Sequence, residues 1–353
     1  MNASRIVVLT AALTAGLLPA TAQAAEKKIH ITGTAYEFNN VTVKLGGAKI
    51  KVAELPSAGT TVKADGTYDL AVPDKKTVTP YIVKDGYRTI YLQTFKLDGE
   101  DLEHVNFQMP SEPIALALAA LLQVPVDANN HPQKCVIVST FSTRNVRGTD
   151  VSFDDFTGYG AHGIAGATAT TSPKLAAPTY FNEKVLPDPA QQLSSKDGGV
   201  IWTGVPAGVY TVKASAPGTK FASFKATCKD GRIVNANPPW GLHELGKPNT
   251  AVVRPVWSGA KIKSLRVSKL PNGATVSFAG KSRKVKGSTV DLASWLPSSK
   301  RTLKRGRTWQ LTVTAPARDG LVARIQLSKS GKPTVTKLCL PLGNTLPRKS
   351  CSQ

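Results

Sequence analysis

The sequence predicts an all-β protein with three consecutive β-modules and one short helix. Hydrophobic and polar residues alternate over short stretches, and 29 Gly and 24 Pro provide turns at the density that short strands need. With 41% hydrophobic and only 19% charged residues, the composition excludes a mostly disordered chain. A length of 353 residues is enough for two or three domains, each with its own core.

Residues 1–24 have the features of a secretory signal peptide. Arg5 precedes an apolar stretch over residues 6–18, and Ala22-Gln23-Ala24 supplies the small residues of a cleavage site. We therefore expect a secreted, extracellular protein. The alternative of a membrane anchor is disfavoured because no stretch reaches the roughly 20 apolar residues of a spanning helix, so the mature chain is expected to have no transmembrane segment.

Two stretches share an Asp-Gly turn followed by an alternating strand that begins with an aromatic residue. The turns are Asp65-Gly66 and Asp197-Gly198. Since side chains of a strand point alternately to its two faces, each strand is expected to bury one face. The expected buried faces consist of Tyr68, Leu70 and Val72 in the first stretch and of Tyr210, Val212 and Ala214 in the second.

These stretches resemble the carboxypeptidase regulatory-like family of small transthyretin-like (prealbumin-like) β-sandwiches. The second carries the family's Val-Pro-x-Gly turn at Val205-Pro206-Ala207-Gly208, which the first lacks. The resemblance implies tandem sandwiches at about residues 27–110 and 133–245. Domains of this family accompany zinc carboxypeptidases, but the catalytic domain would need about 300 further residues, so the resemblance implies no such activity.

Residues 111–124 form the one predicted helix. Ala and Leu favour a helix, Ser111 is a suitable N-cap, and Pro113 falls in the first turn. Because apolar residues occupy nearly every side of this helix, we expect it to bridge the two sandwiches and to pack between them.

Residues 257–353 form a basic β-module. This segment contains 20 Lys or Arg and only two acidic residues, against a formal net charge of +22 for the whole chain. A concentrated positive field attracts polyanions. An exported protein meets anionic cell-wall polymers and membrane surfaces, which we favour as partners over specific nucleic acid. The alternative is that the charge serves solubility alone. The candidate polyanion-binding residues are Lys281, Arg283, Lys284, Lys286, Lys300, Arg301, Lys304, Arg305 and Arg307.

The four cysteines of the mature chain are expected to form disulfides, as is usual in an exported protein with an even number of cysteines. Three pairings exist. We prefer Cys135 with Cys228, since both lie in one predicted module, and Cys339 with Cys351, which closes a short C-terminal loop. The ending from Cys339 to Cys351, with its Cys-Leu-Pro-x-Gly motif, resembles a C-terminal module of exported actinobacterial proteins; the resemblance implies an envelope or extracellular setting.

No motif indicates catalysis, a cofactor or a metal. The chain lacks His-x-His, His-Glu-x-x-His and Gly-x-Ser-x-Gly. His162, Tyr180 and His243 are the nearest candidates for metal ligands, and hydrogen bonding within loops is the better interpretation for the histidines. A hydrolase or metalloenzyme is therefore the weakest hypothesis.

We expect a non-catalytic exported protein that associates with the cell envelope or with extracellular anionic polymers through the basic module. The alternative is a carbohydrate-binding module protein with a carbohydrate-binding-like sandwich fold. Sugar sites use exposed aromatic rings, and Trp240 and Trp295, both in loops next to Pro, are the candidate glycan-binding residues. Trp202 and Trp309 lie in alternating strands and are expected to fill cores.

Overall fold

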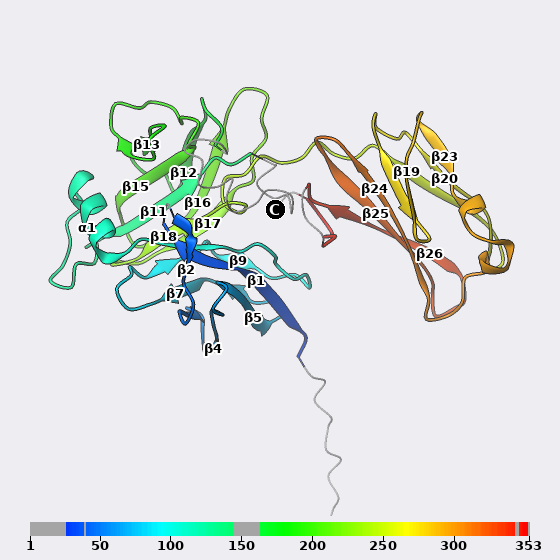
Figure 1. Cartoon of the computed structure of the whole chain (residues 1–353), viewed down its shortest axis with the longest axis horizontal. Coiled ribbons are helices and arrows are strands. Elements are labelled where there is room, and N and C mark those ends of the chain that lie inside the picture. The colour runs from blue at the N-terminus through cyan, green and yellow to red at the C-terminus, as the bar shows by residue number, and fades with distance from the viewer. Residues whose placement is uncertain (1–25, 39, 144–162, 343–345, 352–353) are drawn as a thin grey trace, which may run out of the picture.

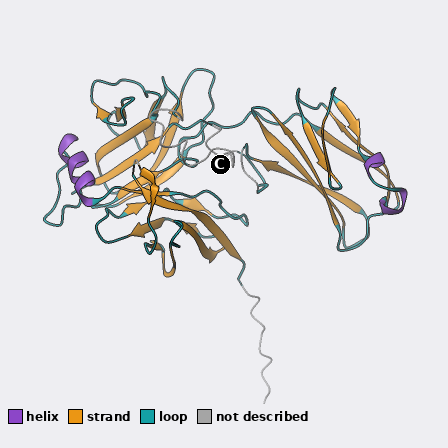
Figure 2. Ribbon diagram, in the orientation of Figure 1, coloured by secondary structure: helices purple, strands orange, loops and turns teal. Residues whose placement is uncertain are grey.

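The computed structural model describes residues 26–38, 40–143, 163–342 and 346–351, and it shows an all-β chain with one α-helix (Figures 1 and 2). The predicted signal peptide lies outside the described residues. The described hydrophobic residues form three main core clusters, contributed by residues 29–109, 135–242 and 253–325, with Trp240 belonging to the first cluster.

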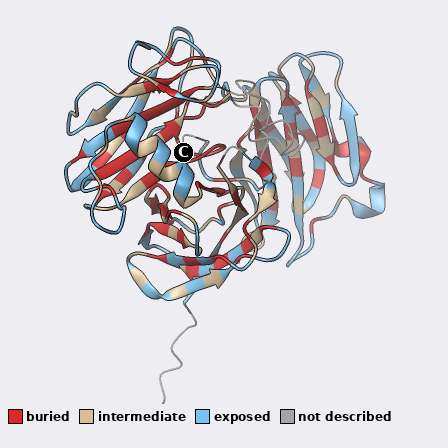
Figure 3. Ribbon diagram, turned by 60° about the vertical axis from the view of Figure 1, so that its left-hand side comes forward, coloured by how far each residue is buried: buried red, intermediate tan, exposed pale blue. Residues whose placement is uncertain are grey.

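The first module pairs a four-stranded sheet with part of a nine-stranded sheet. The strands of the four-stranded sheet are β1 (Lys28–Glu37), β2 (Asn40–Lys44), β5 (Thr67–Pro73) and β10 (Phe107–Met109). The module's strands in the larger sheet are β3 (Lys49–Val52), β4 (Leu55–Thr61), β7 (Pro80–Val83) and β8 (Ile90–Tyr91), and β6 (Thr77–Val78) pairs with β9 (Phe95–Lys96). Tyr68, Leu70 and Val72 of β5 are buried while Asp69 and Ala71 are exposed, so the alternation predicted for this strand is confirmed. Buried and exposed stretches also alternate along other strands of the molecule (Figure 3).

The second module continues the nine-stranded sheet and covers one face of it with a three-stranded sheet. Its strands in the large sheet are β11 (Cys135–Thr140), β13 (Thr179–Phe181), β14 (Pro187–Asp188), β15 (Gly199–Val205) and β18 (Ile233–Ala236). The covering sheet contains β12 (Thr168–Ser172), β16 (Gly208–Ser215) and β17 (Phe224–Cys228). Tyr210 and Val212 are buried and Ala214 is half-buried, in agreement with the predicted face.

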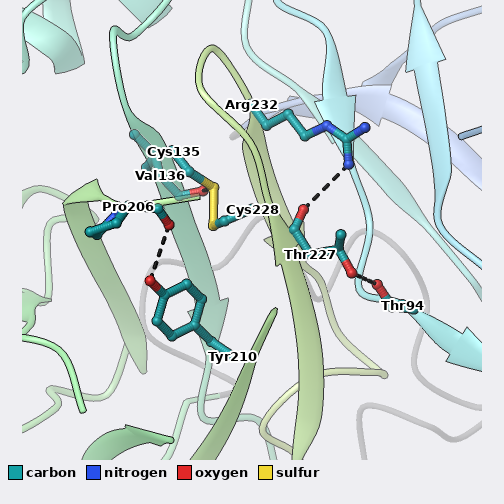
Figure 4. Close-up of a disulfide and its surroundings, with 8 residues drawn as sticks. All are labelled: Thr94, Cys135, Val136, Pro206, Tyr210, Thr227, Cys228 and Arg232. Atoms are coloured by element: carbon teal, nitrogen blue, oxygen red, sulfur yellow. Dashed lines mark hydrogen bonds between the residues drawn. A yellow bond between two sulfur atoms is a disulfide. The ribbon is translucent and has the colours of Figure 1, made fainter. Parts of the chain in front are cut away.

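The first two modules share their sheet. β18 pairs in parallel with β11 of its own module and, through Val234 and Tyr91, with β8 of the first module. Next to this junction the Thr94 and Thr227 hydroxyls lie 2.6 Å apart, and the Arg232 guanidinium lies 4.3 Å from the Tyr91 ring centroid (Figure 4 shows the threonine pair). The shared sheet therefore joins the first two modules into one continuous body.

The helix α1 (Glu112–Leu121) bridges the modules, but it lies on the outer face of the shared sheet and not between two sandwiches. Its start is held by the bond from the Glu112 N–H to the Gly86 carbonyl at 3.0 Å. After its end, Leu122 and Val124 pack on side chains of β11 and β15. No residue of α1 is fully buried, and Ser111 occupies the N-cap without a side-chain capping bond, contrary to expectation.

The third module is a sandwich of a three-stranded and a five-stranded sheet, on the opposite side of the molecule from α1 (Figure 1). The smaller sheet contains β19 (Val252–Ser258), β20 (Lys261–Ser268) and β23 (Thr289–Asp291). The larger sheet runs in the order β22 (Lys281–Lys284), β21 (Thr275–Phe278), β24 (Thr308–Ala315), β25 (Arg318–Leu327) and β26 (Pro333–Leu340). Two 3-10 turns, η3 (Ala293–Trp295) and η4 (Ser298–Lys300), lie between β23 and β24.

Candidate functional site

The first group of predicted cations lies on and just after an edge strand. Among the described strands, β22 pairs only with β21, and all four of its residues are exposed. Lys281, Arg283 and Lys284 belong to this strand, and Lys286 follows it and is also exposed. Within the described part of the sheet, this strand therefore has an unpaired backbone edge as well as exposed cationic side chains.

The second group lies in the segment that leads into β24. The buried Leu303 fixes this segment, and its N–H donates to the Ala260 carbonyl at 3.0 Å. Around this anchor Lys300, Lys304, Arg305 and Arg307 are exposed, while Arg301 is half-buried and donates to the Leu296 carbonyl at 3.3 Å. The backbone is therefore held in place while most of the charges project outward.

The sheet register brings the two groups together. Phe278 at the end of β21 lies opposite both Lys281 of β22 and Leu311 of β24. The turn between β21 and β22 therefore lies beside the start of β24, where Arg307 immediately precedes Thr308. Arg283 also lies over the Trp295 ring, 5.2 Å from its centroid, which places the middle of β22 next to η3. We call these nine Lys and Arg residues the basic edge.

No carboxylate in the described part of the chain forms an ion pair with the basic edge. The two acids of this module have other partners. Asp291 accepts hydrogen bonds from the Leu265 and Ala293 N–H groups at 3.0 and 2.9 Å. Burial raises the pKa of Asp291, but hydrogen bonds, above all that from Ser264, outweigh it and hold the pKa below its ordinary value. Asp319 is buried and accepts from the Leu342 N–H at 3.1 Å.

The edge strand of the basic edge, β22, lies across its sheet from the strand that leads to the docked C-terminus. β22 and β26 are the opposite edges of the five-stranded sheet, and the chain leaves β26 towards the first module. There the Leu346 N–H donates to Glu103 at 3.3 Å, and the Lys349 ammonium lies 3.1 Å from Asp98. The pKa of Asp98 is lowered to about 2, chiefly by the hydrogen bond from Lys75 and then by that from Lys349.

Both predicted disulfides are present, so Cys135 pairs with Cys228 and Cys339 with Cys351. The first lies in the core of the second module, close to Tyr210, whose hydroxyl donates to the Pro206 carbonyl at 3.1 Å (Figure 4). The second closes the C-terminal loop that carries Arg348 and Lys349. Sequence reasoning missed the partner of this loop, the acidic segment Asp98-Gly-Glu-Asp-Leu-Glu103, although four acids in six residues of a basic chain are a visible signal.

The expectation of exposed Trp240 and Trp295 rings is wrong. Their exposed fractions are 6% and 7%, so neither ring offers a face on which a sugar can stack. The Trp240 indole N–H donates to the Glu103 carbonyl at 3.0 Å, and Arg348 lies over its ring at 4.7 Å. Trp295 belongs to the core of the third module. Both loops look exposed in sequence because the residues that cover them come from distant parts of the chain.

The residues considered for metal binding form no ligand set in the described part of the molecule. Tyr180 and His243 are buried, and the Tyr180 hydroxyl accepts a hydrogen bond from the Ala169 N–H at 3.1 Å. His162 lies outside the described residues. Asp319 lies near the sulfurs of Cys339 and Cys351, but these are joined in a disulfide and are not thiolate ligands.

The carboxyl of Asp197 has a raised pKa of about 6, caused by desolvation on burial and partly offset by the hydrogen bond from the Gly199 N–H at 3.0 Å. It lies in the predicted Asp-Gly turn. A raised pKa means that the ionised carboxylate is less favourable in the folded chain than in the unfolded chain, so at neutral pH this carboxylate lowers the free energy of unfolding.

Asp197→Asn is therefore expected to raise the free energy of unfolding by about 2–3 kcal/mol at pH 7.5, because a shift of one pKa unit corresponds to about 1.4 kcal/mol. The folded-state pKa exceeds the unfolded value of 3.8, so the charge penalty grows as pH rises from 3.8 to about 6 and is absent below that window. Denaturant unfolding at pH 4 and 7.5 measures the change. Asp65→Asn, in the other Asp-Gly turn, is the control: hydrogen bonds from Thr67 lower the pKa of Asp65, so this variant is expected to lose stability at pH 7.5. A gain at pH 4 equal to that at pH 7.5 would contradict the argument.

In the described part of the chain, every helix is too short or too polar to cross a bilayer.

No protein-family model matches the chain, and no curated protein matches its sequence. Among solved structures it is similar to the TIE protein of Bacillus anthracis, at 16% identity over 60% of this chain and 33% of that one, with a TM-score of 0.20. A streptococcal ancillary pilin matches at 9% identity over 88% and 95% of the two chains, and the major pilin BcpA of Bacillus cereus at 8% over 59% and 68%, each with a TM-score of 0.20. At these TM-scores, functional conclusions rest on the residues of this chain alone.

Proposed function

We propose that this chain is a non-catalytic exported protein whose basic edge binds an anionic polymer of the cell wall. The observation that carries the proposal is the unneutralised charge of the basic edge: its side chains lie on and after β22 and in the segment that leads into β24, without a described carboxylate partner. Such a surface raises the local concentration of polyanions and attracts them through salt-dependent contacts.

Three further features support this role. The strand β22 of the basic edge lies at the sheet edge opposite β26, which leads to the docked C-terminus, so a long polymer can reach this strand without displacing the tail. The acidic segment over residues 98–103 is engaged by the chain's own tail and does not compete for the cations. All four cysteines are in disulfides, which fits a protein that works in an oxidising extracellular setting.

The test is cosedimentation of the full mature chain with purified cell walls at low and high salt. The test variant replaces Lys281, Arg283, Lys284 and Lys286 by Gln. Each cation near an anionic surface contributes about 1 kcal/mol, so at least a tenfold loss of affinity at low salt is expected. The control variant replaces the equally exposed Lys49, Lys51, Lys63 and Lys76 of the first module by Gln and has the same net charge.

Equal weakening by both variants would assign the binding to net charge, and binding indifferent to salt would overturn the proposal. Walls stripped of their phosphate-bearing polymers are expected to lose the binding. Binding to vesicles of anionic phospholipid with none to walls would assign the surface to membranes instead.

The glycan alternative has no observation in its favour, since both rings on which it depended are buried.

A further inference from the structure

A mostly apolar cavity of about 90 Å³ lies between α1 and the outer face of the nine-stranded sheet. It lies at the junction of the first two modules, because its floor combines Ile90 of β8 with side chains of β11, β15 and β18. The floor from the second module consists of Val136, Val138, Ile201 and Ile233, and the roof from the helix consists of Ala115, Leu118, Ala119 and Leu122.

Three polar side chains line this apolar space: the exposed Asn130 and the buried Arg88 and Asn235. Arg88 is 2% exposed, and its Nη2 donates to Glu112 at the start of α1. Its Nη1 is buried and has no hydrogen-bond acceptor among the described residues. Asn235 is 6% exposed. An unmade hydrogen bond at a buried polar group costs about 1–3 kcal/mol, and more when the group is charged.

The helix does not seal the cavity. Every residue of α1 remains at least partly exposed, although the segment is mostly Ala and Leu. Helix side chains that face an apolar sheet in a closed core are normally fully buried. An apolar pocket with a few convergent polar groups is instead the usual form of a small-molecule site.

The polar groups define what the cavity accepts. A guanidinium offers only donors, so the group next to Nη1 must be an acceptor. Glu112 already balances the charge of Arg88, so a ligand needs no full negative charge. The volume is smaller than the about 150 Å³ that encloses benzene in an engineered cavity, so only a short apolar segment fits inside.

We propose that this cavity binds the carbonyl end of an acyl chain, with the acyl oxygen accepting a hydrogen bond from Arg88 Nη1 and the first carbons lying between α1 and the sheet. The rest of a longer chain leaves through the open side. The site is independent of the basic edge, which belongs to the third module.

Titration calorimetry of the full mature chain with three probes that each carry an eight-carbon chain tests the proposal. Octanoate and methyl octanoate carry acyl oxygens and are expected to bind, and octylammonium, which has the same tail but only donors, is expected to bind at least tenfold more weakly. Octanoate binding well above that of methyl octanoate identifies a free fatty acid as the ligand type, and comparable binding identifies an esterified acyl chain.

Ala119→Trp is the test variant, because Ala119 lines the cavity and a larger ring fills it. Its matched control is Ala117→Trp, at an exposed position of the same helix that does not line the cavity. Ala119→Trp is expected to abolish binding while Ala117→Trp retains it, and unchanged circular dichroism confirms that both fold. Arg88→Lys, which keeps a cation beside Glu112, is expected to weaken octanoate binding at least tenfold. Absence of binding to all three probes, or equal binding by the two Trp variants, overturns the proposal.

Discussion

Replacing Cys135 and Cys228 together by Ser is expected to lower the free energy of unfolding of the joined first and second modules by about 4–5 kcal/mol. The disulfide closes a loop with a sequence separation of 93 residues, and cross-links across loops of about 100 residues contribute about 4.7 kcal/mol by restricting the unfolded chain. Both cysteines are almost fully buried, so the double variant also places two hydroxyls in an apolar core.

The position of this disulfide explains why its loss affects the whole body. Cys135 begins β11 in the shared sheet, and Cys228 ends β17 in the covering sheet. The bond therefore fastens the two layers of the second module beside the junction, where β17 also carries Thr227 (Figure 4).

Guanidinium unfolding followed by far-ultraviolet circular dichroism measures the effect. The control is Cys339→Ser with Cys351→Ser, which opens a loop with a separation of only 12 residues at the chain end, where about 3 kcal/mol is the upper expectation. A terminal variant that destabilises the first two modules as much as the internal one would show that loop length does not govern the effect.

Local patterns predicted the strands well because the alternation of apolar and polar side chains can be read from neighbouring residues in the sequence. Tyr68, Leu70 and Val72 each lie opposite a residue of β1, and their burial follows from period two alone. The basic edge was also foreseeable, since a run of Lys and Arg in a strand rarely tolerates a covering layer.

Long-range contacts were not foreseeable in this way. The parallel pairing of Val234 with Tyr91 joins residues 143 positions apart, and neither neighbourhood carries a pattern that selects the other. The burial of the Arg88 guanidinium could not be predicted from the sequence either. A single Arg in a loop next to a strand is normally exposed to solvent. Sequence therefore predicted elements and charge, while the joined sheet and the cavity depend on tertiary pairing.

Trp240→Ala is expected to lower the free energy of unfolding by about 3–5 kcal/mol, the usual cost of truncating a buried aromatic residue to Ala. Trp240 comes from the second module but packs in the core of the first, with its ring edge-on to Phe95 at a centroid distance of 5.4 Å. Its N–H bond to the Glu103 carbonyl and the Arg348 guanidinium over its ring are lost as well.

The variant separates a packing role from a ligand-binding role. If Trp240 holds the modules and the tail together, Trp240→Ala unfolds at a lower denaturant concentration than the parent protein. Trypsin then also cleaves after Arg348 or Lys349 faster than in the parent, because the tail has lost its contact with the Trp240 ring. Trp240→Phe keeps an aromatic ring against Phe95 and is expected to lose less than half as much stability. If instead Trp240→Ala kept the parental stability and lost a fluorescence response to neutral oligosaccharides, the ring would be a sugar platform. The burial of the indole predicts the first result, because a side chain 6% exposed has almost no surface left to offer a ligand.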